Sequence, residues 1–357
     1  MKYHVSYLED LRRVGKSVRG WKNLKGKTVL ITGASGLIGS AVVDVLAQLN
    51  MDERAGITIL AAGRSAERTE SRFGDRMEKG NIHYYPFDAL KDCAPDQFPD
   101  PLPDYLIHAA GNANPALYGK HPAQTMMTTI LGTQSILQMA AAKPGSRVLY
   151  VSSSEVYGRK DTAEPFQENM FGTVDILNPR SCYPVSRRAA ETLCASAKAE
   201  YGVDFVVARP GHVYGPTMTA ADNRASSQFP RDVAAGKDIV LKSSGSQIRS
   251  YCYILDCASA ILTILLEGES GQAYNISNRD SIVTIRQMAE VFAGAAGRKV
   301  LFDLPTEQEK AVFNPMDNSS LDASRLESLG WKGLFDMETG AKRTLACLMD
   351  EMDGQSH

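Results

Sequence analysis

Residues 27–50 read KTVLITGASGLIGSAVVDVLAQLN, and this stretch decides the fold of the chain. Lys27 to Thr32 is a short run of the buried-strand type, and Ser40 to Asn50 has a helical pattern. The turn between them carries Gly33, Gly36 and Gly39. A strand, a glycine turn and a helix in this order predict a dinucleotide-binding turn, with the helix N-terminus facing the phosphates.

Each glycine has its own role in such a turn. Gly33 permits the tight turn, Gly36 lets the backbone approach a pyrophosphate, and Gly39 lets the helix pack closely on the strand. An ordinary strand-to-helix turn is the alternative, and the flanking strand and helix argue against it. The predicted cofactor contacts in this segment are Gly33, Ser35, Gly36, Leu37, Ile38 and Gly39.

The residues after the second predicted strand, Ile57 to Ala62, bear on the choice of cofactor. NAD-preferring sites usually carry an acid there for the ribose hydroxyls, whereas this chain has Gly63, Arg64 and Ser65. A guanidinium suits a 2′-phosphate, so the predicted cofactor is NAD or NADP with a preference for NADP. The alternative is that Arg64 is an exposed arginine that contacts only solvent.

Four further strands of the same sheet are predicted at Ile82 to Phe87, Tyr105 to His108, Arg147 to Ser152 and Val203 to Arg209. A long helix is predicted at residues 121–142. Strands that alternate with helices predict an α/β fold with a doubly wound Rossmann-type parallel sheet, which binds ligands at its carboxyl edge. The candidate cofactor contacts at that edge are Asp88, for the adenine amino group, and the Ala109, Ala110 and Gly111 strand end.

Three parts of the chain are predicted. Residues 1–26 form an N-terminal extension with an amphipathic helix around Tyr7 to Val18, which packs on the outside of the domain or on a partner subunit. Residues 27–208 form the dinucleotide-binding domain, with a return segment near residues 250–275. Residues 209–350 form a smaller α/β lobe that holds a polar ligand.

Loops and helices are predicted in that smaller lobe. RPGHVYGP, ADNRASSQF and SSGSQIRSY are rich in Gly, Ser, Arg and Asn, which is typical of loops. Helices are predicted at Thr284 to Gly297, Leu321 to Leu329 and Met337 to Met349.

Composition excludes several classes of protein. The chain has 357 residues, 43% of them hydrophobic, which is enough for a sizeable core. The chain has 39 basic and 41 acidic residues and no basic block, so no nucleic-acid partner is expected.

The longest apolar runs, such as Ala260 to Leu266, are far short of the ~20 residues of a membrane span. The six cysteines are Cys93, Cys182, Cys194, Cys252, Cys257 and Cys347; without CxxC or metal-like spacing, they predict reduced thiols in a soluble cytoplasmic protein and no metal site.

The stretch from Val151 to Arg187 carries the residues that could perform chemistry. Tyr183 and Arg187 are four positions apart, so they share one face of a helix, where a cation lowers the pKa of a neighbouring phenol. Such help is needed because an unperturbed tyrosine, with a pKa near ~10, is a poor base at neutral pH. Tyr183 is therefore predicted to be a base; a packed tyrosine beside a surface arginine is the alternative.

Ser153 stands at a predicted strand end, from which it could share the proton of the same substrate hydroxyl. Together with the glycine turn, this arrangement predicts hydride transfer. A base removes the proton of a carbinol oxygen while a nicotinamide takes the hydride from its carbon, and this oxidation needs no metal.

Several motifs together resemble a known family. TGASGLIG, the HAAG strand end, SSSEVYG, Tyr183 with its cation, RPGHVYGP, SQIRSY and AYNISN occur in the order found in extended short-chain dehydrogenases/reductases, the nucleotide-sugar epimerase, dehydratase and decarboxylase family. The resemblance covers roughly residues 27–350. It implies a homodimeric enzyme that uses NAD or NADP and acts on a nucleotide sugar, most simply a UDP-sugar.

The resemblance also implies roles for the residues that match. Tyr183 would be the base, Ser153 its proton partner, Arg187 the holder of the cofactor ribose, and Glu155 a group on the substrate side. These four form the predicted catalytic set, and Tyr183 and Arg187 also contact the cofactor. The implied substrate contacts are Ser154, His212, Arg224 and Arg249, the two arginines at the phosphates or ribose of the nucleotide.

Three residues depart from the pattern of the family. Arg187 stands where the family has lysine; it keeps a positive charge but changes its shape and cannot lose its proton. His212 and Thr129 each stand where asparagine is usual. The Arg187 departure predicts slowed or altered activity.

Ser153, Ser154 and Glu155 bear on which reaction is catalysed. Across these positions the 4,6-dehydratases resemble Thr-Asp-Glu and the UDP-glucuronate decarboxylases Thr-Ser-Glu, whereas 4-epimerases have a small or neutral residue in place of the glutamate. Ser154 is too weak an acid to replace the aspartic acid of a dehydratase. A decarboxylase needs no such acid, because oxidation at C4 makes a β-keto acid that loses carbon dioxide by itself.

The preferred interpretation is therefore a UDP-glucuronate decarboxylase-like enzyme, and RSCY around Cys182, the Asn223–Arg224 pair and GSQIR point the same way. The alternatives are a 4-epimerase, then a 4,6-dehydratase, a dehydrogenase with net reduction of a free substrate, or a non-catalytic sensor of nucleotide sugar or cofactor. For Glu155, the alternative role is to orient a loop or to pair with an arginine.

Overall fold

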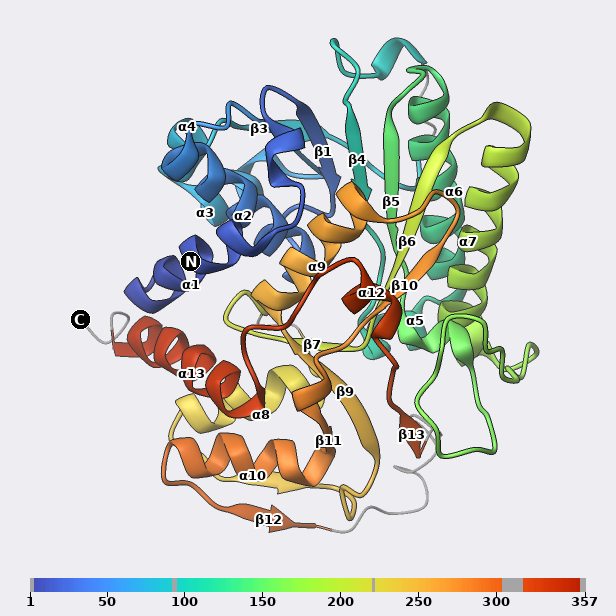
Figure 1. Cartoon of the computed structure of the whole chain (residues 1–357). Helices are drawn as coiled ribbons and strands as arrows, with labels where there is room; N and C mark the ends of the chain where they lie inside the picture. The colour runs from blue at the N-terminus through green and yellow to red at the C-terminus, as the bar shows by residue number, and fades with distance from the viewer. Residues whose placement is uncertain (1–2, 92–94, 220–221, 304–316, 354–357) are drawn as a thin grey trace.

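A parallel sheet forms the centre of the computed structural model, which describes residues 3–91, 95–219, 222–303 and 317–353 (Figure 1). The sheet has seven strands in the order β10-β6-β5-β4-β1-β2-β3. The strands are β1 Thr28–Thr32, β2 Thr58–Gly63, β3 Ile82–Pro86, β4 Tyr105–His108, β5 Arg147–Val151, β6 Asp204–Pro210 and β10 Ala273–Ile276. All their pairings are parallel, which confirms the predicted doubly wound sheet.

Helices cover both faces of this sheet. Alternate residues of β1 pack in opposite directions: Val29 and Ile31 belong to the core that contains α2 (Leu37–Glu53) and α9 (Ile254–Glu267). Leu30 belongs to the core that contains α6 (Pro122–Ala141) and α7 (Cys182–Tyr201). A strand buried on both faces reads as a continuous apolar run, which is why the sequence shows the strands so clearly.

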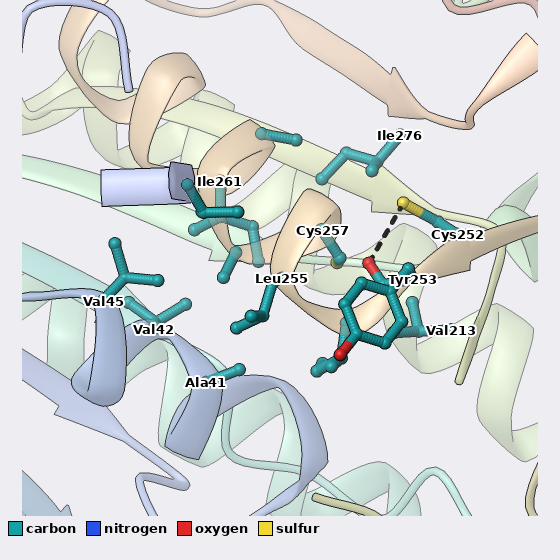
Figure 2. Packing of buried hydrophobic residues seen from close by; sticks show 14 of the residues in the cluster. Ala41, Val42, Val45, Val213, Cys252, Tyr253, Leu255, Cys257, Ile261 and Ile276 are labelled. Carbon is teal, nitrogen blue, oxygen red and sulfur yellow. Dashed lines mark hydrogen bonds between the residues drawn. The ribbon is translucent and has the colours of Figure 1, made fainter. Parts of the chain in front are cut away.

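The packing of α2 on α9 explains the return of the chain to this domain. Figure 2 shows Val42 and Val45 of α2 near Leu255 and Ile261 of α9. Every residue of α9 from Ile254 to Leu265 is buried. This burial follows from its place in the fold, because α9 lies between α2, α1 and the sheet.

The N-terminal extension packs on its own chain. Its helix α1 (Val5–Ser17) contacts α2, α9 and α13 (Met337–Asp353), so the predicted helix is confirmed and needs no partner subunit to cover it. Tyr7 is fully buried, and its hydroxyl donates to Asp44 at 2.9 Å. Asp44 is also paired with Arg72 at 2.5 Å, so a charge network joins the extension to the sheet domain.

The smaller lobe contains two sheets. The first joins β11 (Ile282–Thr284), β9 (Ile248–Tyr253), β13 (Asn318–Ser319) and β7 (His212–Tyr214); the second joins β8 (Ile239–Leu241) and β12 (Val300–Phe302). Its helices are α8 (Ala225–Ala234), α10 (Ile285–Ala295), α12 (Ser324–Ser328) and the C-terminal α13. Figure 1 shows these elements below the large sheet, at the carboxyl ends of its strands.

Four predictions for this lobe need correction. ADNRASSQF was predicted as a loop, but its second half, from Ala225 to Phe229, begins helix α8. RPGHVYGP and SSGSQIRSY contain strands β7 and β9 rather than loops only, and these pair in parallel from His212 opposite Tyr251. The helix expected from Leu321 to Leu329 is the short α12, because Leu321 instead forms a bridge with Phe166. These strands are short and pair with distant segments, so their own sequence gives little periodicity.

Short helices complete the description. They are α3 Ala66–Phe73, α4 Arg76–Lys79, α5 Pro115–Lys120, η1 Trp21–Leu24, η2 Pro95–Gln97, η3 Ser154–Tyr157, η4 Pro179–Ser181 and η5 Arg279–Ser281. The thiols of Cys182, Cys194, Cys252 and Cys257 are free and buried, Cys347 is buried, and Cys93 lies outside the described residues. A bilayer span would need a longer apolar helix than any that the described residues form.

Candidate active site

The glycine turn forms a narrow cradle between β1 and α2. A Cβ at Gly33, whose φ is +67°, would lie 2.9 Å from the carbonyl oxygen of Ala109. A Cβ at Gly39 would lie 2.3 Å from the carbonyl oxygen of Gly33, so both positions exclude a side chain. Gly36 is the N-cap of α2, and no side chain caps the helix there, so its first N–H groups can donate to a ligand. This cradle fits the pyrophosphate of a dinucleotide.

Two further predicted cofactor contacts follow the strands at the far side of the sheet. Arg64 comes directly after β2 and is exposed. Asp88 follows β3, and its Oδ1 accepts from the N–H of Leu90 at 3.2 Å. Beside the glycine turn, Ser35 and Arg68 line a hollow of about 360 Å³. These residues lie on the β2 and β3 side, apart from the predicted catalytic set on α7.

Tyr183 and Arg187 lie on one face of α7, as their spacing predicts. The guanidinium carbon of Arg187 is 5.1 Å from the centre of the Tyr183 ring. Nη1 of Arg187 donates to the hydroxyl of Tyr150 and to the carbonyl of Val151, each at 3.0 Å. Arg187 is 4% exposed, so its charge sits in the interior of the site and not in solvent.

Sequence reasoning missed two residues beside Tyr183. The Tyr118 ring stacks on the Tyr183 ring, with centres 5.2 Å apart and planes at 15°. Arg180 forms an ion pair with Glu155 at 3.1 Å, and its guanidinium lies over Tyr118. Arg180 is three positions before Tyr183, so the RSCY segment held the signal for it; Tyr118 comes from a separate segment that gave none.

Ser153 and Ser154 occupy the turn after β5. The Ser153 hydroxyl accepts from the N–H of Glu155 at 3.2 Å and so caps the short helix η3. Within the described part of the chain, no hydrogen bond joins Ser153 to Tyr183. Ser154 is buried in η3. The predicted proton partner therefore lies at the strand end, where its oxygen holds the backbone that carries Glu155.

The smaller lobe contributes cations and an imidazole. Arg249 on β9 is 3% exposed, and its Nη1 donates to the carbonyl of Ile248 at 2.9 Å. Arg224 precedes α8 and pairs with Asp222 at 2.6 Å. Burial, and then the charges of Arg249 and Arg224, lower the pKa of His212 to about 3, so its ring is neutral at neutral pH.

Electrostatic contacts show which of these residues come together. Burial lowers the pKa of Arg249, and the charge of Glu155 is among those that oppose the shift. Burial also lowers the pKa of Arg224, but Asp222 raises it by more, with smaller contributions from Tyr183 and Tyr118. Cations of the smaller lobe therefore lie within electrostatic range of Glu155 and Tyr183 of the sheet domain, whereas Arg64 and Asp88 do not belong to this group.

Known proteins are similar to this chain along most of its length. The family model described as "NAD dependent epimerase/dehydratase family" matches residues 29–277. UDP-glucuronic acid decarboxylase 6 of Arabidopsis thaliana is 31% identical over 317 residues, covering 87% of this chain and 86% of the relative. UDP-glucuronic acid decarboxylase 1 of Xenopus tropicalis is 27% identical over 336 residues, covering 93% and 74%. The structure of an epimerase from Methanothermobacter thermautotrophicus shares the fold, with a TM-score of 0.79 at 18% identity over 97% of this chain and 96% of that one.

Proposed function

We infer the function from one premise: this chain belongs to the NAD dependent epimerase/dehydratase family. We propose that it decarboxylates a UDP-hexuronate through transient oxidation at C4 of the sugar. The observation that carries this proposal is the Glu155–Arg180 ion pair beside Tyr183, with Ser154 where a dehydratase needs an acid. The relatives named UDP-glucuronic acid decarboxylases support the same choice.

The cofactor site is formed by backbone and by one buried cation. The glycine turn from Gly33 to Gly39 and the first N–H groups of α2 would hold the pyrophosphate, and Arg187 would donate to the ribose. When bound, NAD or NADP takes the hydride from C4 of the sugar and returns it in the same turnover. Arg64, exposed after β2, supports NADP because its guanidinium can meet a 2′-phosphate.

Tyr183 is the proposed base. It would remove the proton of the C4 hydroxyl, and the guanidinium of Arg187, 5.1 Å from its ring, would stabilise the phenolate. Tyr118 stacks on the same ring and limits the directions in which the phenol can turn. Ser153 would share the proton of the C4 hydroxyl from the end of β5.

The nucleotide would lie between the two lobes. Arg224 and Arg249 carry positive charge toward the phosphates, and the neutral imidazole of His212 can donate or accept a hydrogen bond beside them. Asp222 holds the Arg224 guanidinium by two of its nitrogens, so the guanidinium is already oriented before a ligand arrives. Arg180, held by Glu155, would face the sugar and its carboxylate.

Decarboxylation follows from the ketone at C4. The carboxylate on C5 is then β to the C4 carbonyl, so the C5–C6 bond breaks, carbon dioxide leaves, and the electron pair of that bond forms an enolate with its charge on O4. The proton that Tyr183 has gained lies beside O4 and would stabilise that charge. A proton from solvent would then add to C5, and return of the hydride to C4 would give the pentose. Ser154 is not acidic enough to expel a sugar hydroxyl, which disfavours dehydration.

The test is product analysis by mass spectrometry. Purified protein is incubated with UDP-glucuronate and NAD or NADP, and we expect a UDP-pentose whose mass is lower by one carbon dioxide. Tyr183→Phe should lower kcat by about 10³-fold, because general base catalysis is worth 10²–10⁴-fold. A product of unchanged mass would identify an epimerase, and tight cofactor binding without any turnover would identify a sensor.

Assembly, location and domain boundaries complete the proposal. From the family resemblance we propose a homodimer in the cytoplasm, and the buried free thiols suit a reducing compartment. We also propose the division into residues 27–208 with a return segment, and 209–350. Light scattering of the purified protein tests the dimer: a monomer at micromolar concentration would contradict it.

A further inference from the structure

The anchoring of Arg187 differs from that of Arg209, which is also buried. Nη1 donates to two neutral oxygens, the Tyr150 hydroxyl and the Val151 carbonyl, each at 3.0 Å. Nε is buried and has no partner among the described residues. Arg209, by contrast, has its charge matched by Glu191 at 2.6 Å. Neutral anchors fix the Arg187 guanidinium in place without cancelling its charge, which stays available to Tyr183 and to a ligand.

Gly111 provides the space that the guanidinium occupies. A Cβ at position 111 would lie 2.5 Å from Nη2 of Arg187 and 3.3 Å from its central carbon. Side-chain ends can usually move away from such a collision, but Nη1 of Arg187 is held by two hydrogen bonds. Any residue larger than glycine at position 111 would therefore push the guanidinium off its anchors. It would also strain the backbone, because the φ of +157° at this position is rarely adopted by residues other than glycine.

Tyr150 sets the direction of the guanidinium. It lies on β5 and is fully buried, with its ring stacked on His108, the last residue of β4, at 5.9 Å between centres. His108 is itself held by Thr32 at 2.7 Å. The tyrosine hydroxyl is thus presented from a rigid support, and it is one of the two anchors of Nη1. Phenylalanine at this position would keep the packing and lose the anchor.

Lysine at position 187 would not make the same set of contacts with Tyr150, Val151 and Gly111. A planar guanidinium can donate to Tyr150 and Val151 through one nitrogen while its other nitrogen faces Gly111, whereas an ammonium is a single point of charge. Gly111 follows β4 at the carboxyl edge of the sheet, where the dinucleotide is proposed to bind. Nη2 therefore lies at the cofactor side of the site.

We propose that Gly111 and Tyr150 are positioning residues for Arg187, so that arginine is the functional residue at position 187 and lysine would not improve it. Gly111 makes room for the guanidinium and Tyr150 aims it between the Tyr183 phenol and the cofactor. This inference rests on the proposed function of the site.

The experiment is a set of single and double variants of the full chain. Gly111→Ala should lower kcat about 100-fold, since displacing a catalytic group by about 1 Å costs that much. Arg187→Lys and Tyr150→Phe should each lower kcat roughly tenfold, with a higher dissociation constant for the cofactor, because each removes a hydrogen bond of a charged group. The KM for the nucleotide sugar should stay nearly constant in all three variants.

The double variant Gly111→Ala with Arg187→Lys is decisive. Lysine lacks the nitrogen that the new methyl group would strike, so Gly111→Ala should lower kcat far less in the Arg187→Lys background than in the wild type. The backbone strain at φ +157° is the same in both backgrounds, so the difference between them reports the collision with the guanidinium. Effects that multiply would show that Gly111 acts through its backbone and not through the guanidinium. A gain of rate in Arg187→Lys would also overturn the proposal.

Matched controls separate function from folding. Tyr157→Phe removes another buried hydroxyl that accepts from an arginine, Arg209, at 3.0 Å, and should lower thermal stability while keeping the pattern of kinetic constants. Gly294→Ala adds a methyl group where no atom lies within 4 Å and should change nothing.

If Gly111→Ala does not fold, Tyr150→Phe and Arg187→Lys decide the proposal. If the wild type turns over no UDP-hexuronate, the proposed function fails. The cofactor dissociation constants of the same variants then still test whether Gly111 and Tyr150 position Arg187.

Discussion

The glycine turn and the arginines of the candidate site are built in different ways. The turn from Gly33 to Gly39 is made of backbone, and it depends on missing side chains. The arginine cluster, defined as Arg180, Arg224 and Arg249, is made of long side chains from three separate segments. A phosphate would meet N–H groups in the first and guanidinium groups in the second. Ligand binding at the turn should therefore be lost when side-chain atoms are added. Binding at the arginine cluster should be lost when side-chain atoms are removed.

The largest expected effect tests the turn. In Gly39→Ala the added methyl group would lie 2.3 Å from the Gly33 carbonyl oxygen and separate α2 from β1. We expect the free energy of unfolding to fall by about 3 kcal/mol and the cofactor dissociation constant to rise about 100-fold. Denaturant unfolding and fluorescence titration measure the two quantities. Unchanged cofactor affinity would show that the glycine turn does not hold the cofactor.

The next effect tests the cluster. Arg249→Ala removes a buried cation from β9, and we expect KM for the nucleotide sugar to rise roughly 30-fold, as for the loss of a charge-assisted hydrogen bond. Cofactor affinity should stay the same, which is the opposite of the result for Gly39→Ala. Arg279→Ala, an exposed arginine paired with Glu327, serves as the control for the loss of charge. Equal KM values in both variants would remove Arg249 from the cluster.

The pH dependence of stability sharpens the comparison further. Burial, then Arg249 and Arg224, lower the pKa of His212 to about 3, below the ~6.5 of an exposed histidine. Between these values the unfolded chain binds a proton that the folded chain does not, so stability falls as the pH drops through this window. Wild type should lose about 1 kcal/mol per pH unit more than His212→Asn below pH ~6.

Urea unfolding at several pH values measures this difference. Asp256 works in the opposite direction, because burial raises its pKa to about 7 and the folded chain holds its proton, but both proteins contain it. The exposed His83 supplies the control variant His83→Asn, which should follow the wild type. If the free energy of unfolding falls equally with pH in wild type and in His212→Asn, the prediction is wrong.

The smallest effect concerns Arg64. Arg64→Ala should weaken NADP binding about fivefold and leave NAD binding unchanged, since an exposed ion pair is worth up to about 1 kcal/mol. Titration with both cofactors measures the ratio. Equal changes for NAD and NADP would show that Arg64 does not meet the 2′-phosphate.

The fold was predictable from sequence to the extent that its signals are local. The strand, glycine turn and helix at residues 27–50 are contiguous, so the pattern alone indicated them. Tyr183 and Arg187 were placed on one helix face by spacing. Strands β7 and β9 were not predicted, because each is short and is defined by pairing with a distant partner.

The remaining parts of the candidate site depend on contacts between distant segments. Tyr118 stacks on Tyr183 from another helix, and no pattern in either segment indicates that contact. Gly111 was assigned to the cofactor, but its meeting with Arg187 needs the geometry of β4 against α7. Such contacts are set by packing, which a single sequence does not display.

The buried thiols give the chain a set of internal reporters. Cys182 adjoins Tyr183, Cys194 lies in the middle of α7, and Cys257 lies in α9. Burial raises the pKa of each of these thiols, so a thiol-alkylating reagent reaches them only when the surrounding segment opens. The order in which they are modified would map local unfolding across the molecule, and slower labelling of Cys182 with cofactor and substrate present would register closure of the site directly.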